Sequence, residues 1–430
     1  MSTSEELSAA AVRTAPPLPP VALYVHVPFC VSHCPYCDFV VYAGSYARGP
    51  HARTEVFYDA LERELELRAD ALDAAVRASF GEGRERPARA PLETLYFGGG
   101  TPSLVPAARV ARLIESVRRR FGLAGDAEVT LEANPGPDER GDLAGFADAG
   151  VNRISFGAQS MDAAELRRLG RRHSPGDVAA AVAAARDAGI ASINLDLLYD
   201  VPGQSEESWQ RTLHGATQLN PDHLSLYALT LDDPDTEGIT GEKGDHLPTA
   251  PGARRWRETA AKDQDDDRAA AQYLWASERL AAQGWRHYEI ANWARPGLES
   301  RHNLAYWRRL PYEAIGPGAH AFDGTTRRWN AANLERYVAA LLPPEGEPHL
   351  PPGASETIDA RTARAEELIL GLRLDEGVEA DRQFDPAEKQ AFDWAGSAGL
   401  LEPFELQGHP RLRLTPRGRL LSNELFARLV

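Results

Sequence analysis

The stretch CVSHCPYC, from Cys30 to Cys37, contains all three cysteines of this 430-residue chain. Disulfide frameworks use even numbers of cysteines spread along a short secreted chain, so this spacing does not fit one. Three thiolates in a C-x3-C-x2-C loop can instead bind three irons of a cubane [4Fe–4S] cluster and leave the fourth iron without a protein ligand. The alternatives are a zinc site with His33 or Asp38 as fourth ligand, and a chance group of core cysteines.

The composition is that of an ordinary globular protein, since 43% of the residues are hydrophobic and 26% are charged. The net charge of −16 argues against nucleic acid as a partner, because phosphate binding needs a basic field. Residues 1–20 lack the basic and apolar regions of a signal peptide, and we expect them to form a disordered lead-in. No apolar run has the length of a membrane span, and an iron–sulfur site without disulfides favours a reducing cytoplasm.

Short apolar runs alternate with amphipathic stretches from residue 21 onward. Such alternation predicts βαβ units and a parallel sheet, so the expected fold class is α/β. Because βαβ units share one handedness, six of them predict a partial (β/α)6 barrel that is open on one side. The helical stretches are Pro106–Arg120, Asp162–Leu169 and Ser205–Gln218. The six predicted strands are Val21–Val27, Leu92–Gly98, Ala127–Ala133, Val151–Gly157, Ala191–Leu198 and His223–Leu229.

The pattern changes after the sixth strand, and we predict four parts: the lead-in (1–20), the barrel (21–240), an accessory segment (241–340) and a C-terminal unit (356–430). Thr240–Arg268 is rich in Gly, Pro and charge, which indicates a linker or surface insertion. A helix is predicted over Ala269–Gln283, and the Pro-rich break Leu341–Ser355 precedes the last unit. We expect that unit to be a small α+β, winged-helix-like domain with a packing or lid role.

Polar and glycine residues recur where the predicted strands end. Tyr24 precedes the cysteine loop, the turn Gly98–Pro102 follows strand two, and Glu132, Gln159 and Asp196 lie at the ends of strands three, four and five. Because the carboxyl ends of parallel barrel strands share one face, these residues should line one mouth. Each has a simpler explanation alone: a glycine-rich turn is often only a turn, and a buried carboxylate is often half of an ion pair. Their common placement favours a shared site.

Several motifs extend this picture along the chain. The stretches LYVHVPFC, CPYCDF, YFGGGTPS, LEANPG, VNRISFGAQS, NLDLLYDVPGQ and HLSLYALT resemble the oxygen-independent coproporphyrinogen III oxidase-like group of the radical S-adenosylmethionine (radical SAM) superfamily. The more discriminating YEIANWARPG, RHNLAYW and IGPGAHAF are similar to the heme chaperone branch of that group. The resemblance runs from Tyr24 to His320, the terminal LTPRGRLLSNELF also fits it, and it implies a partial barrel.

The resemblance also implies a ligand for the predicted mouth. Cys30, Cys34 and Cys37 would hold the [4Fe–4S] cluster, and S-adenosylmethionine would bind the open iron. The N–H and C=O groups of the glycine turn would bond the methionyl amino group. Arg171, on the helix after strand four, would clamp the carboxylate. The residues expected to contact S-adenosylmethionine are Tyr24, Tyr36, Gly99, Gly100, Thr101, Glu132, Gln159, Arg171 and Asp196.

Two features separate the chain from the true oxidase. The oxidase has a fourth cysteine two residues beyond the third, where this chain has Phe39, and a longer N-terminal segment. In the heme chaperone branch the His of H-N-x-x-Y-W is implicated in heme binding, which corresponds to His302. A neutral imidazole is a good axial ligand for heme iron, and a helix over Arg301–Trp307 would place Tyr306 on the same face. A buried histidine among core aromatics is the alternative.

The sequence therefore predicts a cytoplasmic heme-trafficking protein that passes heme to apo-hemoproteins. The cluster would support assembly, dimerisation or handover, with a reducing donor such as flavodoxin or ferredoxin. The second hypothesis is an enzyme in which a 5′-deoxyadenosyl radical starts the decarboxylation of coproporphyrinogen III. A third is another radical SAM reaction on a tetrapyrrole, such as methylation or ring opening.

Overall fold

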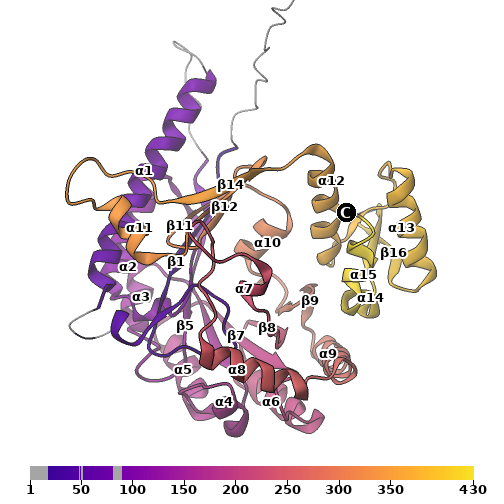
Figure 1. The fold of residues 1–430 in the computed structure, drawn as a ribbon. Coiled ribbons are helices and arrows are strands. Elements are labelled where there is room, and N and C mark those ends of the chain that lie inside the picture. The colour runs from indigo at the N-terminus through magenta and orange to yellow at the C-terminus, as the bar shows by residue number, and fades with distance from the viewer. Residues whose placement is uncertain (1–17, 48, 50–51, 81–89) are drawn as a thin grey trace, which may run out of the picture.

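The computed structural model describes residues 18–47, 49, 52–80 and 90–430, so most of the predicted lead-in lies outside the described residues. The fold is mixed α/β and is built on one large twisted sheet (Figure 1). Its strand order is β14-β13-β12-β11-β1-β4-β5-β6-β7-β8-β10-β9. A small C-terminal unit with its own three-stranded sheet lies to one side of it.

All six predicted strands are present, and they are parallel neighbours in the centre of the sheet. On each of these strands apolar side chains alternate with others, and the apolar side chains face the outer helices. Leu23 and Val25, for example, point outward from the first strand and are fully buried, while Tyr24 between them points inward. The strands are β1 (Ala22–Val27), β4 (Leu92–Gly99), β5 (Leu123–Ala133), β6 (Arg153–Gln159), β7 (Ser192–Tyr199) and β8 (His223–Ala228).

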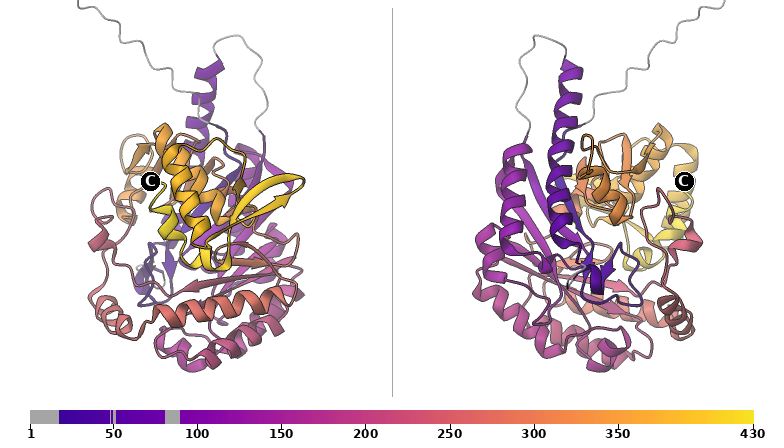
Figure 2. Two further views of the ribbon diagram at one scale, coloured as in Figure 1. Left: turned by 90° about the vertical axis from the view of Figure 1, so that its right-hand side faces the viewer. Right: turned by 60° about the vertical axis from the view of Figure 1, so that its left-hand side comes forward.

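Helices cover the outer face of this sheet, and its inner face is left for the site (Figure 2). The three predicted helical stretches are confirmed. Side-chain N-caps such as Asp162 and Ser205 fix where two of them begin. The outer helices are α1 (Thr54–Phe80), α2 (Ala107–Arg120), α3 (Leu143–Ala149), α4 (Ala163–Arg168), α5 (Pro175–Asp187), α6 (Glu206–Gln218), α9 (Asp266–Ala281) and α11 (Leu334–Leu341).

The accessory segment extends the sheet at both edges. β11 (Tyr312–Ile315) pairs in parallel with β1, and β12 (His320–Phe322), β13 (Thr326–Asn330) and β14 (Gly353–Thr357) follow it antiparallel. At the opposite edge, β10 (Asn292–Ala294) pairs with β8 and β9 (Arg286–Glu289) pairs with β10. The segment therefore shares its sheet with the barrel, and the boundary at residue 240 stays a prediction.

The stretch Thr240–Arg268, predicted as a linker or surface insertion, contains a helix that the sequence analysis did not predict, α8 (Pro251–Ala260). Pro251 suits the first helical position, and Ala253, Arg257 and Ala260 form one buried face of the helix. The acidic run at the end of the stretch starts α9: the Asp265 carboxylate accepts hydrogen bonds from the N–H groups of residues 267 and 268. Acidic side chains are favourable at a helix N-terminus, which explains the run.

The C-terminal unit is small, α+β and winged-helix-like. It begins with α12 (Ala360–Arg373) and contains β15 (Val378–Glu379), α13 (Pro386–Ser397), β16 (Leu401–Leu406), β17 (His409–Leu414), α14 (Pro416–Leu420) and α15 (Ser422–Phe426). Its apolar side chains form a core separate from that of the barrel. None of the helices described by the structure combines the length and apolar character needed to cross a bilayer.

Candidate functional site

A cavity of about 610 Å³ lies inside the barrel, at the carboxyl ends of the parallel strands. Most residues that the sequence predicted for the site line this cavity. Tyr24 and Thr101 do not line it, but each contacts a residue that does: Tyr24 stacks on Tyr96, with ring centroids 6.1 Å apart, and Thr101 lies against Cys30. His302 is outside it as well. The predicted residues in the lining are Cys30, Cys34, Tyr36, Cys37, Gly99, Gly100, Glu132, Gln159, Arg171 and Asp196.

The cysteine loop leaves the barrel through two very short strands. Cys30 ends β2 (Phe29–Cys30), which pairs in parallel with β3 (Tyr42–Ala43). The Cys30 Sγ lies 3.1 Å from the Thr101 Oγ1. The backbone N–H of Cys37 donates to the carbonyl of Cys34 at 3.1 Å, which closes the loop into a turn. All three thiols are half-buried and unpaired by disulfides.

The chemistry of these three thiols fits a cluster. Burial raises the pKa of Cys30 to about 12 and raises that of Cys37 further, so both are neutral thiols when no iron is bound. Bound iron holds cysteine in the thiolate form, which removes this cost. Within the described residues, no three His, Cys, Asp or Glu side chains gather around one point as a single metal ion requires. A cubane cluster does not need the three thiolates to meet at one point, because each thiolate bonds a separate iron.

The glycine turn after β4 packs directly against the strand that carries the cysteines. A Cβ on Gly99, which has φ of 109°, would lie 2.4 Å from the His26 ring. A Cβ on Gly100 would lie 2.7 Å from the Phe29 carbonyl oxygen, so both positions need glycine. The backbone N–H groups of Gly99 and Gly100 donate to Glu132 Oε2 at 3.0 Å and to the Val27 carbonyl at 2.9 Å.

This finding corrects one expectation. The N–H groups of the turn were predicted to bond a ligand amino group, but they are already bonded inside the protein. A backbone N–H group is a hydrogen-bond donor, and an ammonium is also a donor. Only the carbonyl groups of the turn can therefore accept a hydrogen bond from a ligand ammonium.

Two half-buried carboxylates face the cavity. Glu132 accepts a hydrogen bond from the Tyr96 hydroxyl at 2.8 Å, and burial, followed by the charge of Asp196, raises its pKa to about 7. Asp196 accepts from Ser155 at 3.0 Å and from Asn194 at 2.7 Å, and burial raises its pKa as well. Neither carboxylate forms an ion pair with a cationic side chain in the part of the chain that the structure describes. The ion-pair explanation considered from the sequence therefore does not apply to them.

Arg171 lies in the loop after α4 and not on the helix, which corrects its predicted position. Its guanidinium donates to the Gly157 carbonyl at 2.8 Å and to the Asn134 side-chain oxygen, and it lies 3.6 Å from the Cys34 Sγ. Gln159 has a left-handed φ of 61°, where the pairing of β6 with β7 shifts register. Such a bulge re-aims side chains, and this one directs the end of β6 into the cavity.

Arg257 of α8 is a site residue that sequence reasoning missed. Its Nε donates to the Pro35 carbonyl at 3.1 Å and its Nη2 donates to the Cys37 carbonyl at 2.8 Å. It also donates to the carbonyl of Asp232. One buried guanidinium thus ties the cysteine loop to α8. The helical spacing of Ala253, Arg257 and Ala260 after Pro251 was the signal that could have located this helix.

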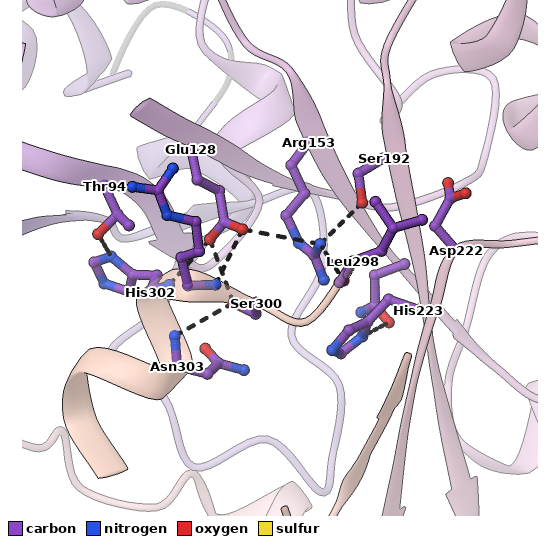
Figure 3. A network of polar contacts seen from close by, with 12 residues as sticks. Thr94, Glu128, Arg153, Ser192, Asp222, His223, Leu298, Ser300, His302 and Asn303 are labelled. Atoms are coloured by element: carbon purple, nitrogen blue, oxygen red, sulfur yellow. Dashed lines mark hydrogen bonds and ion pairs between the residues drawn. The ribbon is translucent and has the colours of Figure 1, made fainter. Parts of the chain in front are cut away.

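His302 belongs to α10 (Arg301–Trp307) and is fully buried. Its Nδ1 lies 2.7 Å from the Thr94 Oγ1 (Figure 3). Its Nε2 lies 2.8 Å from the Tyr306 hydroxyl, so both ring nitrogens have partners. Burial lowers its pKa to about 3, so the ring is neutral. The predicted helix and the predicted placement of Tyr306 on the same face as His302 are confirmed. The ring lies against Tyr96, which lines the cavity, with centroids 5.0 Å apart.

The N-terminus of α10 is anchored by a carboxylate from β5. Glu128 accepts from the backbone N–H groups of Arg301 at 3.1 Å and of His302 at 3.0 Å. Arg153 lies 3.9 Å from the same carboxylate and donates to Ser192 at 2.9 Å (Figure 3). A negative charge at a helix N-terminus is stabilising, and this anchor fixes the HNLAYW segment against the barrel.

Comparison with known proteins agrees with the fold. The family model of the Radical SAM superfamily matches residues 24–215. The structure of coproporphyrinogen III oxidase (HemN) from Escherichia coli aligns with a TM-score of 0.72 over 96% of this chain and 90% of that chain, at 22% sequence identity. This similarity shows a shared fold. The barrel and its three-cysteine loop define a radical SAM protein.

Curated relatives show to which family within the superfamily the chain belongs. The heme chaperone HemW of Mycobacterium tuberculosis (strain H37Rv) is 37% identical over 96% of both chains. HemW of Escherichia coli (strain K12) is 39% identical over 70% of both chains. A mitochondrial radical S-adenosyl methionine domain-containing protein 1 of Bos taurus is 35% identical, with 94% of this chain and 85% of the bovine protein covered. The chain belongs to the HemW heme chaperone family of the radical SAM superfamily.

The hydrogen bonds from Arg257 to the cysteine loop lead to a prediction about how firmly the loop holds iron. Arg257→Ala should bind iron and sulfide on anaerobic reconstitution, yet lose iron to a chelator at least about threefold faster, because three loop-anchoring hydrogen bonds are removed. Iron release is followed by absorbance of the chelate. Arg254→Ala is the matched control, because Arg254 lies on the same helix but pairs with Asp233 and Asp235, away from the cysteine loop. Equal release rates for the two variants would contradict the proposed anchoring of the loop by Arg257.

Proposed function

We propose that this protein is a heme chaperone that binds heme and transfers it to apo-hemoproteins. The observation that supports this most strongly is the full-length similarity to HemW of Mycobacterium tuberculosis, with 37% identity over 96% of both chains. Transfer to apo-hemoproteins, an electron donor such as flavodoxin or ferredoxin, and a cytoplasmic location are parts of the same proposal. A reducing compartment keeps the three cysteines available as thiolates.

The proposal assigns the cavity to the cluster and S-adenosylmethionine. Cys30, Cys34 and Cys37 would hold the [4Fe–4S] cluster, which when bound supplies an open iron and a one-electron reductant. In this proposal Glu132 accepts from the ligand ammonium and Asp196 accepts from the ribose hydroxyls. Arg171, already beside Cys34, is placed to meet a carboxylate. The remaining proposed contacts are Tyr24, Tyr36, Gly99, Gly100, Thr101 and Gln159.

Phe39 favours the chaperone over coproporphyrinogen decarboxylation. Its side chain is 59% exposed and lines the cavity two residues beyond Cys37. A hydrocarbon side chain cannot supply the thiol that the oxidase motif has at this position. An exposed phenylalanine is instead suited to contact an apolar ligand or partner.

His302 is the proposed heme ligand, and its surroundings define what binding requires. The neutral ring is in the correct protonation state for an axial ligand. Its Nε2 faces the Tyr306 hydroxyl, so the heme iron must replace that hydrogen bond, at a cost of about 1 kcal/mol. Its Nδ1 keeps Thr94, and such a partner on the second nitrogen orients a metal-bound imidazole.

The raised pKa of Glu132 gives a testable pH dependence. Because the pKa is about 7, this carboxyl is mostly neutral at pH 6 and mostly ionised at pH 8. An ammonium needs the ionised form, so affinity for S-adenosylmethionine should increase about tenfold between pH 6 and pH 8. Calorimetric titration of reconstituted protein measures it. Glu132→Gln should bind weakly with a flat profile, and exposed Glu115→Gln should behave as wild type. An unchanged slope in Glu132→Gln would contradict the assignment.

Heme binding and handover test the proposed function itself. Reconstituted wild-type protein should bind heme with a Soret shift, transfer it to an apo-hemoprotein, and leave coproporphyrinogen III unconverted under reducing conditions. His302→Ala should lower heme affinity about tenfold or more, because the axial nitrogen is lost. His349→Ala, at an exposed histidine, is the control. Decarboxylation by the wild type would overturn the chaperone proposal, and an unchanged Soret spectrum in His302→Ala would overturn the ligand assignment.

A further inference from the structure

Ion pairs connect the end of α10 to the C-terminal unit. Arg308 and Arg309 directly follow the HNLAYW segment. The Arg309 Nε donates to Glu366 of α12 at 2.9 Å, and the Arg308 Nη2 donates to Glu376 at 3.1 Å. α12 lies beside α10 (Figure 1). Each arginine on the barrel side therefore meets a carboxylate of the C-terminal unit.

Each of these carboxylates has a second arginine from the barrel sheet. Arg327 of β13 donates to the other oxygen of Glu366 at 2.6 Å, and Arg286 of β9 lies 3.8 Å from Glu376. Burial would raise the pKa of Glu366, but the hydrogen bonds from Arg327 and Arg309 outweigh it and lower the pKa below its usual value. Glu366 is thus an ionised carboxylate held between two guanidinium groups.

Arg309 has more bonding capacity than its present partners use. Its backbone is left-handed, with φ of 54°, and its guanidinium lies over the Phe322 ring at 4.6 Å. Its Nη2 is buried and has no hydrogen-bond partner among the described residues. The Trp307 indole N–H, two residues earlier, is in the same state, with the Arg373 guanidinium 4.3 Å above its ring. Buried donors without acceptors are costly, so a ligand that supplies oxygens here gains free energy.

We propose that Arg308, Arg309 and Arg327 form a binding site for the two propionates of heme, and that Glu366 and Glu376 occupy this site when heme is absent. The inference rests on the proposed function and deepens it. Guanidinium groups bind carboxylates bidentately, whichever molecule supplies them. A rise of 1.5 Å per residue places Arg308 about 9 Å along α10 from His302, which is the scale of the distance from a porphyrin's centre to its acid-bearing edge.

The C-terminal unit then acts as a carboxylate-bearing lid. The Arg308–Glu376 pair is partly exposed, and such pairs contribute little net stability. A dicarboxylate ligand can displace it and then compete with Glu366 for Arg309 and Arg327. Displacement releases α12 from the end of α10 and uncovers Trp307, whose ring lies under Arg373 of α12 and could then stack on the porphyrin. When Glu366 and Glu376 pair with the arginines again, they compete with the propionates and favour heme release. Heme binding is then reversible.

Removing the competing carboxylates tests this inference. The double variant Glu366→Gln/Glu376→Gln of the full chain should bind heme about fivefold more tightly than wild type in Soret titrations. The control is Glu367→Gln: this neighbour on α12 pairs with Arg382 inside the C-terminal unit and should leave the affinity unchanged. Heme dimethyl ester is the second probe, because its propionates carry no charge. The gain should vanish with the ester, and Arg308→Gln should weaken binding of heme but not of the ester.

The outcomes separate this inference from the proposed function. If the double variant binds heme as Glu367→Gln does, or gains as much affinity for the ester as for heme, the propionate site is wrong while heme binding stands. If the wild type binds neither heme nor its ester, the proposed function fails and the propionate site fails with it. Circular dichroism and iron content confirm that each variant is folded.

Discussion

The close approach of the glycine turn to the cysteine-bearing strand is the constraint on which the site depends. Gly99 and Gly100 bring the end of β4 into contact with His26 and Phe29, at distances that exclude any Cβ. This contact places Cys30 over the mouth of the barrel and brings Thr101 to its sulfur. Bulkier residues in the turn would push the cysteine loop away from the strand ends, and the three thiols would no longer line the cavity.

The cavity has side chains of both charge signs in its lining, which supports the proposed binding of a ligand that carries both. Glu132 and Asp196 lie on one side without a cationic partner among the described side chains, and their raised pKa values reflect that cost. Arg171 lies on the side of the cysteine loop, beside Cys34. An amino acid zwitterion such as the methionyl part of S-adenosylmethionine can satisfy both groups. The protein holds the carboxylates in place through neutral donors such as Tyr96 and Asn194, which leaves their charge uncompensated.

The sequence predicted the parts of the fold whose signal is local. The central strands have long apolar runs, and the polar residues at their ends fall on one face because parallel strands share their direction. Strands of three to five residues, such as β11 and β12, carry too little periodicity to be recognised. The role of Arg257 depends on a carbonyl contact with Cys37, 220 residues away, which no local pattern encodes. The full burial of His302 likewise depends on Thr94 from a distant strand.

Two iron sites are the central claim of this account: a cluster at the cysteine loop inside the barrel, and heme beside α10 under the C-terminal unit. Iron anomalous diffraction from crystals of reconstituted, heme-loaded protein tests it most directly. The account predicts a strong peak among Cys30, Cys34 and Cys37 and a second, separate peak next to His302. A heme iron located inside the cluster cavity, or an iron peak at the cysteines alone in crystals that retain the heme spectrum, would contradict it.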